Sequence, residues 1–191
     1  MSASITTDPT TDLTDFLAFH GVDTAAFGVG TAKSLAQLAG EIAAGESVLS
    51  LDEDGRVVRD AAGACVNVYH RTADGRLLRL VEDRQELANG LVRRRDLNSS
   101  IGEKLMRGER PLAGARRALR EELGLDVDPP LRADYLMLRV TDSFSYPGLR
   151  SRYAITYFRC TLDDDAYRPE GYVEVQPDKH NFFCWTTVDD T

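Results

Sequence analysis

The feature that most constrains the fold is residues 102–125, which read GEKLMRGERPLAGARRALREELGL and predict a loop followed by a helix. Gly102 and Gly108 bound the loop. Pro111 suits the first position of a helix, where its missing N–H would have no intrahelical partner anyway. Gly124 predicts the helix end, because glycine takes a left-handed cap conformation without strain. Between them, apolar residues recur at the spacing of one buried helix face: Leu112, Ala115, Leu119 and Leu123.

The charges of this stretch suggest a function. Glu121 and Glu122 are adjacent near the C-terminal end of the helix, where the helix dipole disfavours anions. A bound cation would compensate them. Arg117 stands one turn earlier and Glu109 just before the helix, so a carboxylate–guanidinium network would do the same. An exposed helix with ordinary surface charges would also explain the glutamate pair taken alone.

The spacing of these residues resembles the Nudix box: Gly, five residues, Glu, seven residues, then Arg-Glu-apolar-any-Glu-Glu-any-Gly-apolar. In residues 103–125, Glu109 takes the first Glu and Arg117 the Arg. Leu119, Glu121, Glu122, Gly124 and Leu125 take the positions that follow. Two positions depart from the pattern. Glu103 stands where Gly is expected, and Ala118 replaces the Glu after Arg117.

The resemblance implies an α/β fold, a Nudix-type α/β/α sandwich with a mixed central sheet, preceded here by an N-terminal helical extension. We expect a disordered tail over residues 1–11, the extension over 12–45, packed or dimerised through an apolar face, and the Nudix-like domain over 46–191. In the extension, Ser34 and Gln37 have capping-box spacing, and Gly45 should end that helix. The alternating segments predicted as strands are 48–51, 56–59, 64–70, 77–81, 91–95, 135–140, 153–162 and 181–185.

The resemblance further implies hydrolysis of a diphosphate linkage with Mg²⁺ or Mn²⁺. Glu121 and Glu122 would hold the metal, with Glu103 as a further ligand from the loop. Arg117 would orient the carboxylates and Glu109 would brace the loop. Because Ala118 removes one carboxylate from the helix face, we expect at most one tightly held ion, bound weakly without a diphosphate. In many Nudix enzymes a loop late in the chain supplies a further carboxylate to the metal or to the attacking water. Here either Glu174 or Asp178 could be that residue.

A second group of residues is predicted to bind the substrate. Arg93, Arg95 and Lys104 are cationic candidates for the phosphates of a small diphosphate or nucleotide-like ligand. Phe144 and Tyr146 lie in a loop close to arginines, where exposed rings would stack on a planar group. Solvated strand charges and a packed loop with buried rings are the alternatives.

The charge distribution narrows the class of ligand. Net charge is −8 over 191 residues. Residues 61–120 hold thirteen Lys or Arg against seven Asp or Glu, whereas 1–60 and 121–191 are each acidic by seven charges. A basic centre in an acidic chain suits a small polyanion and argues against duplex nucleic acid. No apolar run has transmembrane length, and the three cysteines have no metal spacing, so we expect a cytoplasmic protein with no membrane contact.

Two other functions fit the altered box. Loss of the carboxylate at Ala118 suits a binding or regulatory module that keeps the Nudix fold without catalysis. The same scaffold could also perform a non-hydrolytic reaction, such as an isomerisation or a cyclisation, since a fold does not fix its chemistry.

Overall fold

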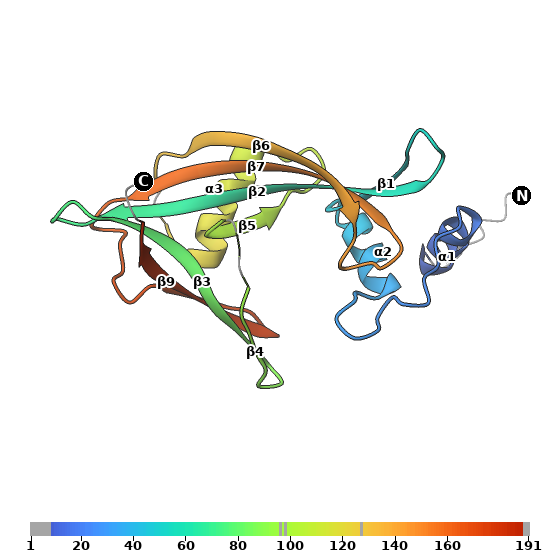
Figure 1. Cartoon of the computed structure of the whole chain (residues 1–191), viewed down its shortest axis with the longest axis horizontal. Helices are drawn as coiled ribbons and strands as arrows, with labels where there is room; N and C mark the ends of the chain where they lie inside the picture. The colour runs from blue at the N-terminus through green and yellow to red at the C-terminus, as the bar shows by residue number, and fades with distance from the viewer. Residues whose placement is uncertain (1–8, 96, 98, 127, 189–191) are drawn as a thin grey trace, which may run out of the picture. The chain divides into compact units, whose positions relative to one another are not determined.

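The computed structural model describes residues 9–95, 97, 99–126 and 128–188, arranged as one sheet with helices (Figure 1). The predicted tail therefore lies outside the described residues up to residue 8. The elements in chain order are α1 (Pro9–Phe19), α2 (Leu35–Ala43), β1 (Val48–Leu51), β2 (Val57–Arg71), β3 (Leu77–Leu87), β4 (Val92–Arg93), β5 (Ile101–Lys104), α3 (Pro111–Leu123), β6 (Arg132–Asp142), β7 (Arg150–Leu162), β8 (Tyr172–Val175) and β9 (Lys179–Thr187).

The sheet is mixed, as predicted. Its strand order is β6-β7-β2-β3-β9-β8, with β1 and β5 paired to β2 and β4 paired to β3. β3 pairs antiparallel with both β2 and β9. β2 and β7 run parallel, since Cys65 contacts Tyr157 and, five residues further along both strands, His70 contacts Leu162. The α/β class and the N-terminal helix are therefore confirmed.

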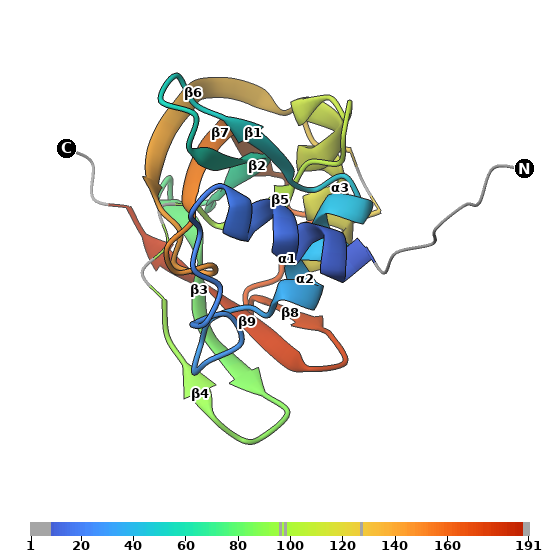
Figure 2. The ribbon, with the colours of Figure 1, turned by 90° about the vertical axis from the view of Figure 1, so that its right-hand side faces the viewer.

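The chain divides into two compact units that interleave along the sequence. Unit 1 comprises the described part of residues 1–62, with 105–108 and 138–154. Its core joins α1 and α2, seen in blue in Figure 2, to the start of β2 and the 143–149 loop. The buried side chains of this core are Leu17, Leu38, Val57, Tyr146 and Leu149. The predicted capping box is confirmed: Ser34 Oγ accepts from the N–H of Gln37, whose side chain accepts from the N–H of Ser34.

Unit 2 comprises residues 63–104, 109–137 and the described part of 155–191, and contains the whole of α3. Residues of α3 and of the sheet supply much of its buried core, which includes Ala64, Val66, Val68, Leu80, Ala115, Ala118, Leu119, Leu123 and Phe183. Pro111 is the first residue of α3, and Gly124 ends it at φ 62°. Both predicted ends of this helix are therefore confirmed. The predicted domain boundary at residues 45 and 46 stays a prediction.

Candidate functional site

Arg117 is the centre of a carboxylate network in unit 2. Its Nε and Nη2 donate to the two oxygens of Glu109 at 3.2 and 3.0 Å. Its Nη1 donates to Glu103 at 2.8 Å and to Glu121 at 3.3 Å, and Nη2 also donates to the Lys104 carbonyl at 2.7 Å. These bonds, led by the one to Glu109, raise the pKa of Arg117. One planar guanidinium thus holds the β5 strand, the loop and the helix together.

Glu122 lies beside this network but has a different environment. Its Oε1 accepts the backbone N–H of Gly102 at 3.0 Å. Burial, followed by the charges of Glu174, Glu103 and Glu82, raises the pKa of Glu122 to about 8. No ion pair joins Glu122 to a cationic side chain among the described residues. The helix therefore presents one carboxylate surrounded by like charges and lacking a cation.

Of Glu174 and Asp178, the two candidates for a further carboxylate, Glu174 is the one whose charge acts on α3, the helix that contains Arg117, Glu121 and Glu122. Its side chain accepts from the amides of Gln176 and Asn181, and Asn181 in turn accepts from Gln85 at 2.8 Å. Glu174 is buried and its charge acts on Glu122, whereas Asp178 is exposed in the turn between β8 and β9. The sequence does not distinguish these two carboxylates, because local spacing does not reveal the pairing of β8 with β9 that accompanies the burial of Glu174.

The position of the missing carboxylate is part of the core. Ala118 is fully buried, with 0% of its surface exposed. Glu103, at the glycine position of the box, instead supplies a half-buried carboxylate to Arg117. Burial leads the causes that raise the pKa of Glu103, while its bond to Arg117 lowers it.

The predicted phosphate-binding residues belong to the same unit, and one of them is paired with an acidic side chain. Arg95 makes a two-point ion pair with the buried Glu82, with Nε at 2.8 Å. Arg93 is exposed in β4, opposite Gln85 of β3. Lys104 lies in β5, where its carbonyl accepts from Arg117. Of this set, Arg93 offers the most accessible charge.

The predicted stacking residues lie in unit 1 and differ from each other. Phe144 is 90% exposed. Tyr146 is 0% exposed, with its ring 5.4 Å from that of Phe27. For Tyr146 the alternative of a packed loop with buried rings therefore holds, because the 143–149 loop packs against α1 and α2, whereas the ring of Phe144 is open.

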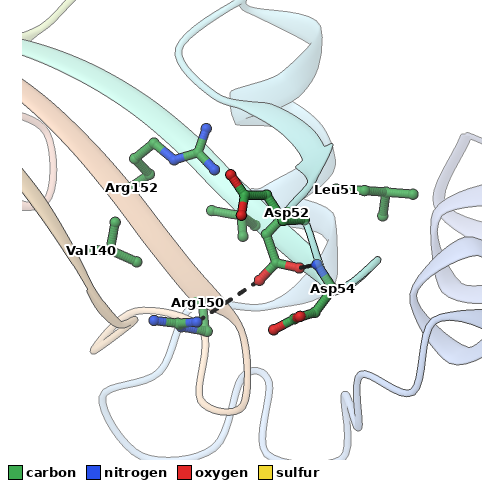
Figure 3. A pocket seen from close by; sticks show the side chains of 8 residues that line it. Leu51, Asp52, Asp54, Val140, Arg150 and Arg152 are labelled. Carbon is green, nitrogen blue, oxygen red and sulfur yellow. Dashed lines mark hydrogen bonds and ion pairs between the residues drawn. The ribbon is translucent and has the colours of Figure 1, made fainter.

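A hollow of about 400 Å³ also occurs in unit 1 (Figure 3). None of the residues that line it belongs to the Nudix box. Asp52 and Asp54 come from the β1–β2 turn, and Arg150 and Arg152 from β7. Asp52 lies 3.9 Å from Arg150, and Arg152 pairs with Asp60 at 3.3 Å. Its charges therefore compensate each other.

The carboxylates around Arg117 and at Glu122 are oxygen ligands of the kind that a hard divalent ion prefers. Oxygen ligands are what Mg²⁺ and Mn²⁺ take, and Glu122 lacks a cationic partner in the described part of the chain. Within those same residues, no three His, Cys, Asp or Glu side chains converge as a complete ligand group.

Comparisons with known proteins agree with the box. The NUDIX domain family matches residues 64–191, two thirds of the chain. The chain belongs to the Nudix family. None of the curated protein sequences matches it. Among the described residues, no helix is long and apolar enough to cross a membrane.

The solved structures to which this chain is similar include the following three. T. brucei MERS1 bound to RNA is 20% identical, over 58% of this chain and 37% of that one, with a TM-score of 0.39. C. elegans Ap4A hydrolase is 14% identical, over 68% and 81%, with a TM-score of 0.38. A MutT/nudix family protein from Enterococcus faecalis is 11% identical, over 83% and 52%, with a TM-score of 0.48. The chain thus spans less than two thirds of MERS1 and of the E. faecalis protein.

Proposed function

We propose that this Nudix protein hydrolyses a diphosphate linkage in a nucleotide-like or other small diphosphate, using Mg²⁺ or Mn²⁺. The observation that carries the proposal is Glu122, held by the Gly102 N–H among like charges, beside carboxylates that Arg117 fixes in place. When bound, the metal neutralises diphosphate charge and lowers the pKa of a coordinated water.

The protein's own residues have separate tasks in this proposal. Arg117 pairs with Glu103, Glu109 and Glu121, offsets part of their negative charge and keeps their oxygens in a fixed arrangement. Glu122 and Glu121 provide ligand oxygens from the helix, and Glu174 adds a negative charge from β8. Arg93 supplies an exposed positive charge for the substrate's phosphates. The predicted cytoplasmic location stays a prediction, as does dimerisation through residues 12–45, the alternative to their packing within the chain.

Hydrolysis assays test the proposal. The purified protein is incubated with Mg²⁺ or Mn²⁺ and a panel of nucleotide sugars, dinucleoside polyphosphates and NADH, and phosphate release is measured after phosphatase treatment. Wild type and Glu170→Gln, an exposed glutamate of unit 2, should be active, and Glu122→Gln should lose at least about a hundredfold in kcat/KM. Activity that survives Glu122→Gln unchanged contradicts the assigned role.

Buried Ala118 favours a second candidate, a Nudix module that binds its ligand without turnover. The Nudix box has a glutamate at the position of Ala118, and we expect a hydrolase that keeps the full box to use that carboxylate. Calorimetry distinguishes the two candidates: micromolar binding of a panel member with no product formed over hours supports the binding module.

A further inference from the structure

An apolar groove of about 330 Å³ lies in unit 1 and is lined by residues of α1, α2 and β1. Its apolar side chains are Leu13, Phe16, Ile42, Val48 and Leu49. Leu13, Ile42 and Leu49 pack against the buried core of the unit. Phe16 and Val48 are 37% and 48% exposed. The core therefore holds the floor of the groove in place, while its rim is open to solvent.

Arg107 is the charged residue of the lining. Its backbone packs closely on the end of α2, because a Cβ built on Gly45 would lie 3.1 Å from the Cβ of Arg107 and 3.2 Å from its N. The side chain of Arg107 is exposed. Among the residues that the structure describes, none forms an ion pair or a hydrogen bond with its guanidinium. A cation with available donors thus stands at an apolar groove, an arrangement that suits an amphiphilic anion.

The charge around the groove limits the anion to a single negative charge. Residues 1–60 supply every lining residue except Arg107, and they carry ten Asp or Glu against three Lys or Arg. These surroundings repel a polyanion or an anionic membrane surface, whereas one carboxylate is compensated by one guanidinium. The volume of the groove lies at the lower end of the range for small-molecule sites, about 300–1,000 Å³.

We propose that this groove binds the monoanion of a medium-chain carboxylic acid. The hydrocarbon chain lies along Leu13, Ile42 and Leu49, and the carboxylate accepts hydrogen bonds from Arg107. Loose packing of a surface helix would also leave an apolar gap, but it gives no reason for an uncompensated cation there. The inference goes beyond the proposed function, since all the lining residues except Arg107 precede residue 64, where the family match begins.

Calorimetry with decanoate, hexanoate and decanol tests the inference. The titrations are made at about pH 7.5, where a carboxylic acid is ionised, and below the concentration at which decanoate forms micelles. Decanoate should bind about tenfold or more tightly than hexanoate, because each buried methylene group adds to the favourable transfer from water. Decanoate should also bind about threefold to fivefold more tightly than decanol, which has the same chain without the charge.

Two variants with matched controls test the assigned residues. Arg107→Gln should weaken decanoate binding by about threefold to fivefold and leave decanol binding within about twofold. Val48→Glu adds a like charge at the rim and should weaken decanoate binding by about tenfold or more. The controls are Arg56→Gln, at an exposed arginine of unit 1, and Leu51→Glu, at a residue of β1 that is also 48% exposed. Neither control residue lines the groove, and both variants should bind decanoate like wild type. Melting curves check that every variant is folded.

Four outcomes would overturn the inference, and the proposed diphosphate hydrolysis would stand after each of them. Decanoate does not bind wild type, or it binds Arg107→Gln and Val48→Glu as tightly as wild type. Decanol binds as tightly as decanoate, so that the groove recognises no charge. The protein sediments with phosphatidylglycerol vesicles and Val48→Glu does not, which makes a lipid surface the partner. Ultracentrifugation finds a dimer that Val48→Glu dissociates, which makes a second copy of the chain the occupant.

Discussion

Glu103 Oε2 accepts a hydrogen bond from Arg117 Nη1 at 2.8 Å, although Glu103 occupies the glycine position of the Nudix box. The bond makes Glu103 part of the same network as Glu109 and Glu121. A substitution that restores the family's glycine would therefore remove a carboxylate from the site rather than repair it.

Glu103→Gly should weaken Mn²⁺ binding, by about threefold to tenfold, because Arg117 would lose one of its carboxylates and turn more fully to Glu121. Calorimetric titration of Mn²⁺ measures the change. Glu103→Ala removes the carboxylate without adding backbone freedom and should behave alike. Tighter binding in Glu103→Gly would show that Glu103 obstructs the metal.

Ala118→Glu should destabilise the protein by about 2 to 4 kcal/mol, because the new carboxylate would enter a fully buried position in the core. Chemical unfolding measures the loss. Ala113→Glu, at an exposed position of the same helix, should change the free energy of unfolding by no more than about 0.5 kcal/mol. A stable Ala118→Glu protein with raised hydrolysis would mean that the helix readily presents this carboxylate to the substrate.

Metal-free protein should become less stable as pH rises from about 5 to about 8. The folded pKa of Glu122, about 8, exceeds its ordinary value of 4.5. Between those values the folded state binds more protons than the unfolded state, so stability decreases with rising pH, by at most about 1.4 kcal/mol per pH unit from one group. Melting temperatures in EDTA should show a smaller decrease in Glu122→Gln than in wild type. If the melting temperatures of wild type and Glu122→Gln depend equally on pH, Glu122 is not the group that loses its proton over this range.

A buried ion network should stabilise unit 1. Glu41 accepts from Arg59 at 2.7 Å and from Lys33 at 2.6 Å, and its side chain is 8% exposed. Glu41→Gln leaves the buried Arg59 charge uncompensated and should cost about 3 kcal/mol. Lys33→Met, at the more exposed partner, should cost about 1 kcal/mol or less. Equal losses in urea unfolding would contradict the dominant role of the Arg59 pair.

The sequence predicted those residues of the candidate site that lie in one continuous segment, residues 103–125. The box spacing placed Glu109, Arg117 and Glu121 close enough to interact, because a loop and one helix turn bring them together. The ends of the box helix and the capping box of α2 were predicted for the same reason.

The rest depends on contacts between distant segments. Glu174 comes close enough for its charge to act on Glu122 through the β8–β9 pairing, and Tyr135 gains its ring partner, Tyr157, through β6 and β7. Alternation of apolar residues predicts strands but not which strands become neighbours. Burial of Tyr146 likewise depends on how α1 and α2 pack, which periodicity leaves open.

Electron paramagnetic resonance of Mn²⁺ tests the central claim, that Glu122 and its neighbours form a divalent-ion site completed by a diphosphate. Wild type, Glu122→Gln and the Glu170→Gln control are titrated with and without methylenediphosphonate. We predict one Mn²⁺ per chain in wild type and control, bound at least about tenfold more tightly with the diphosphonate, and loss of that site in Glu122→Gln. Mn²⁺ binding that is indifferent to Glu122 would contradict the account.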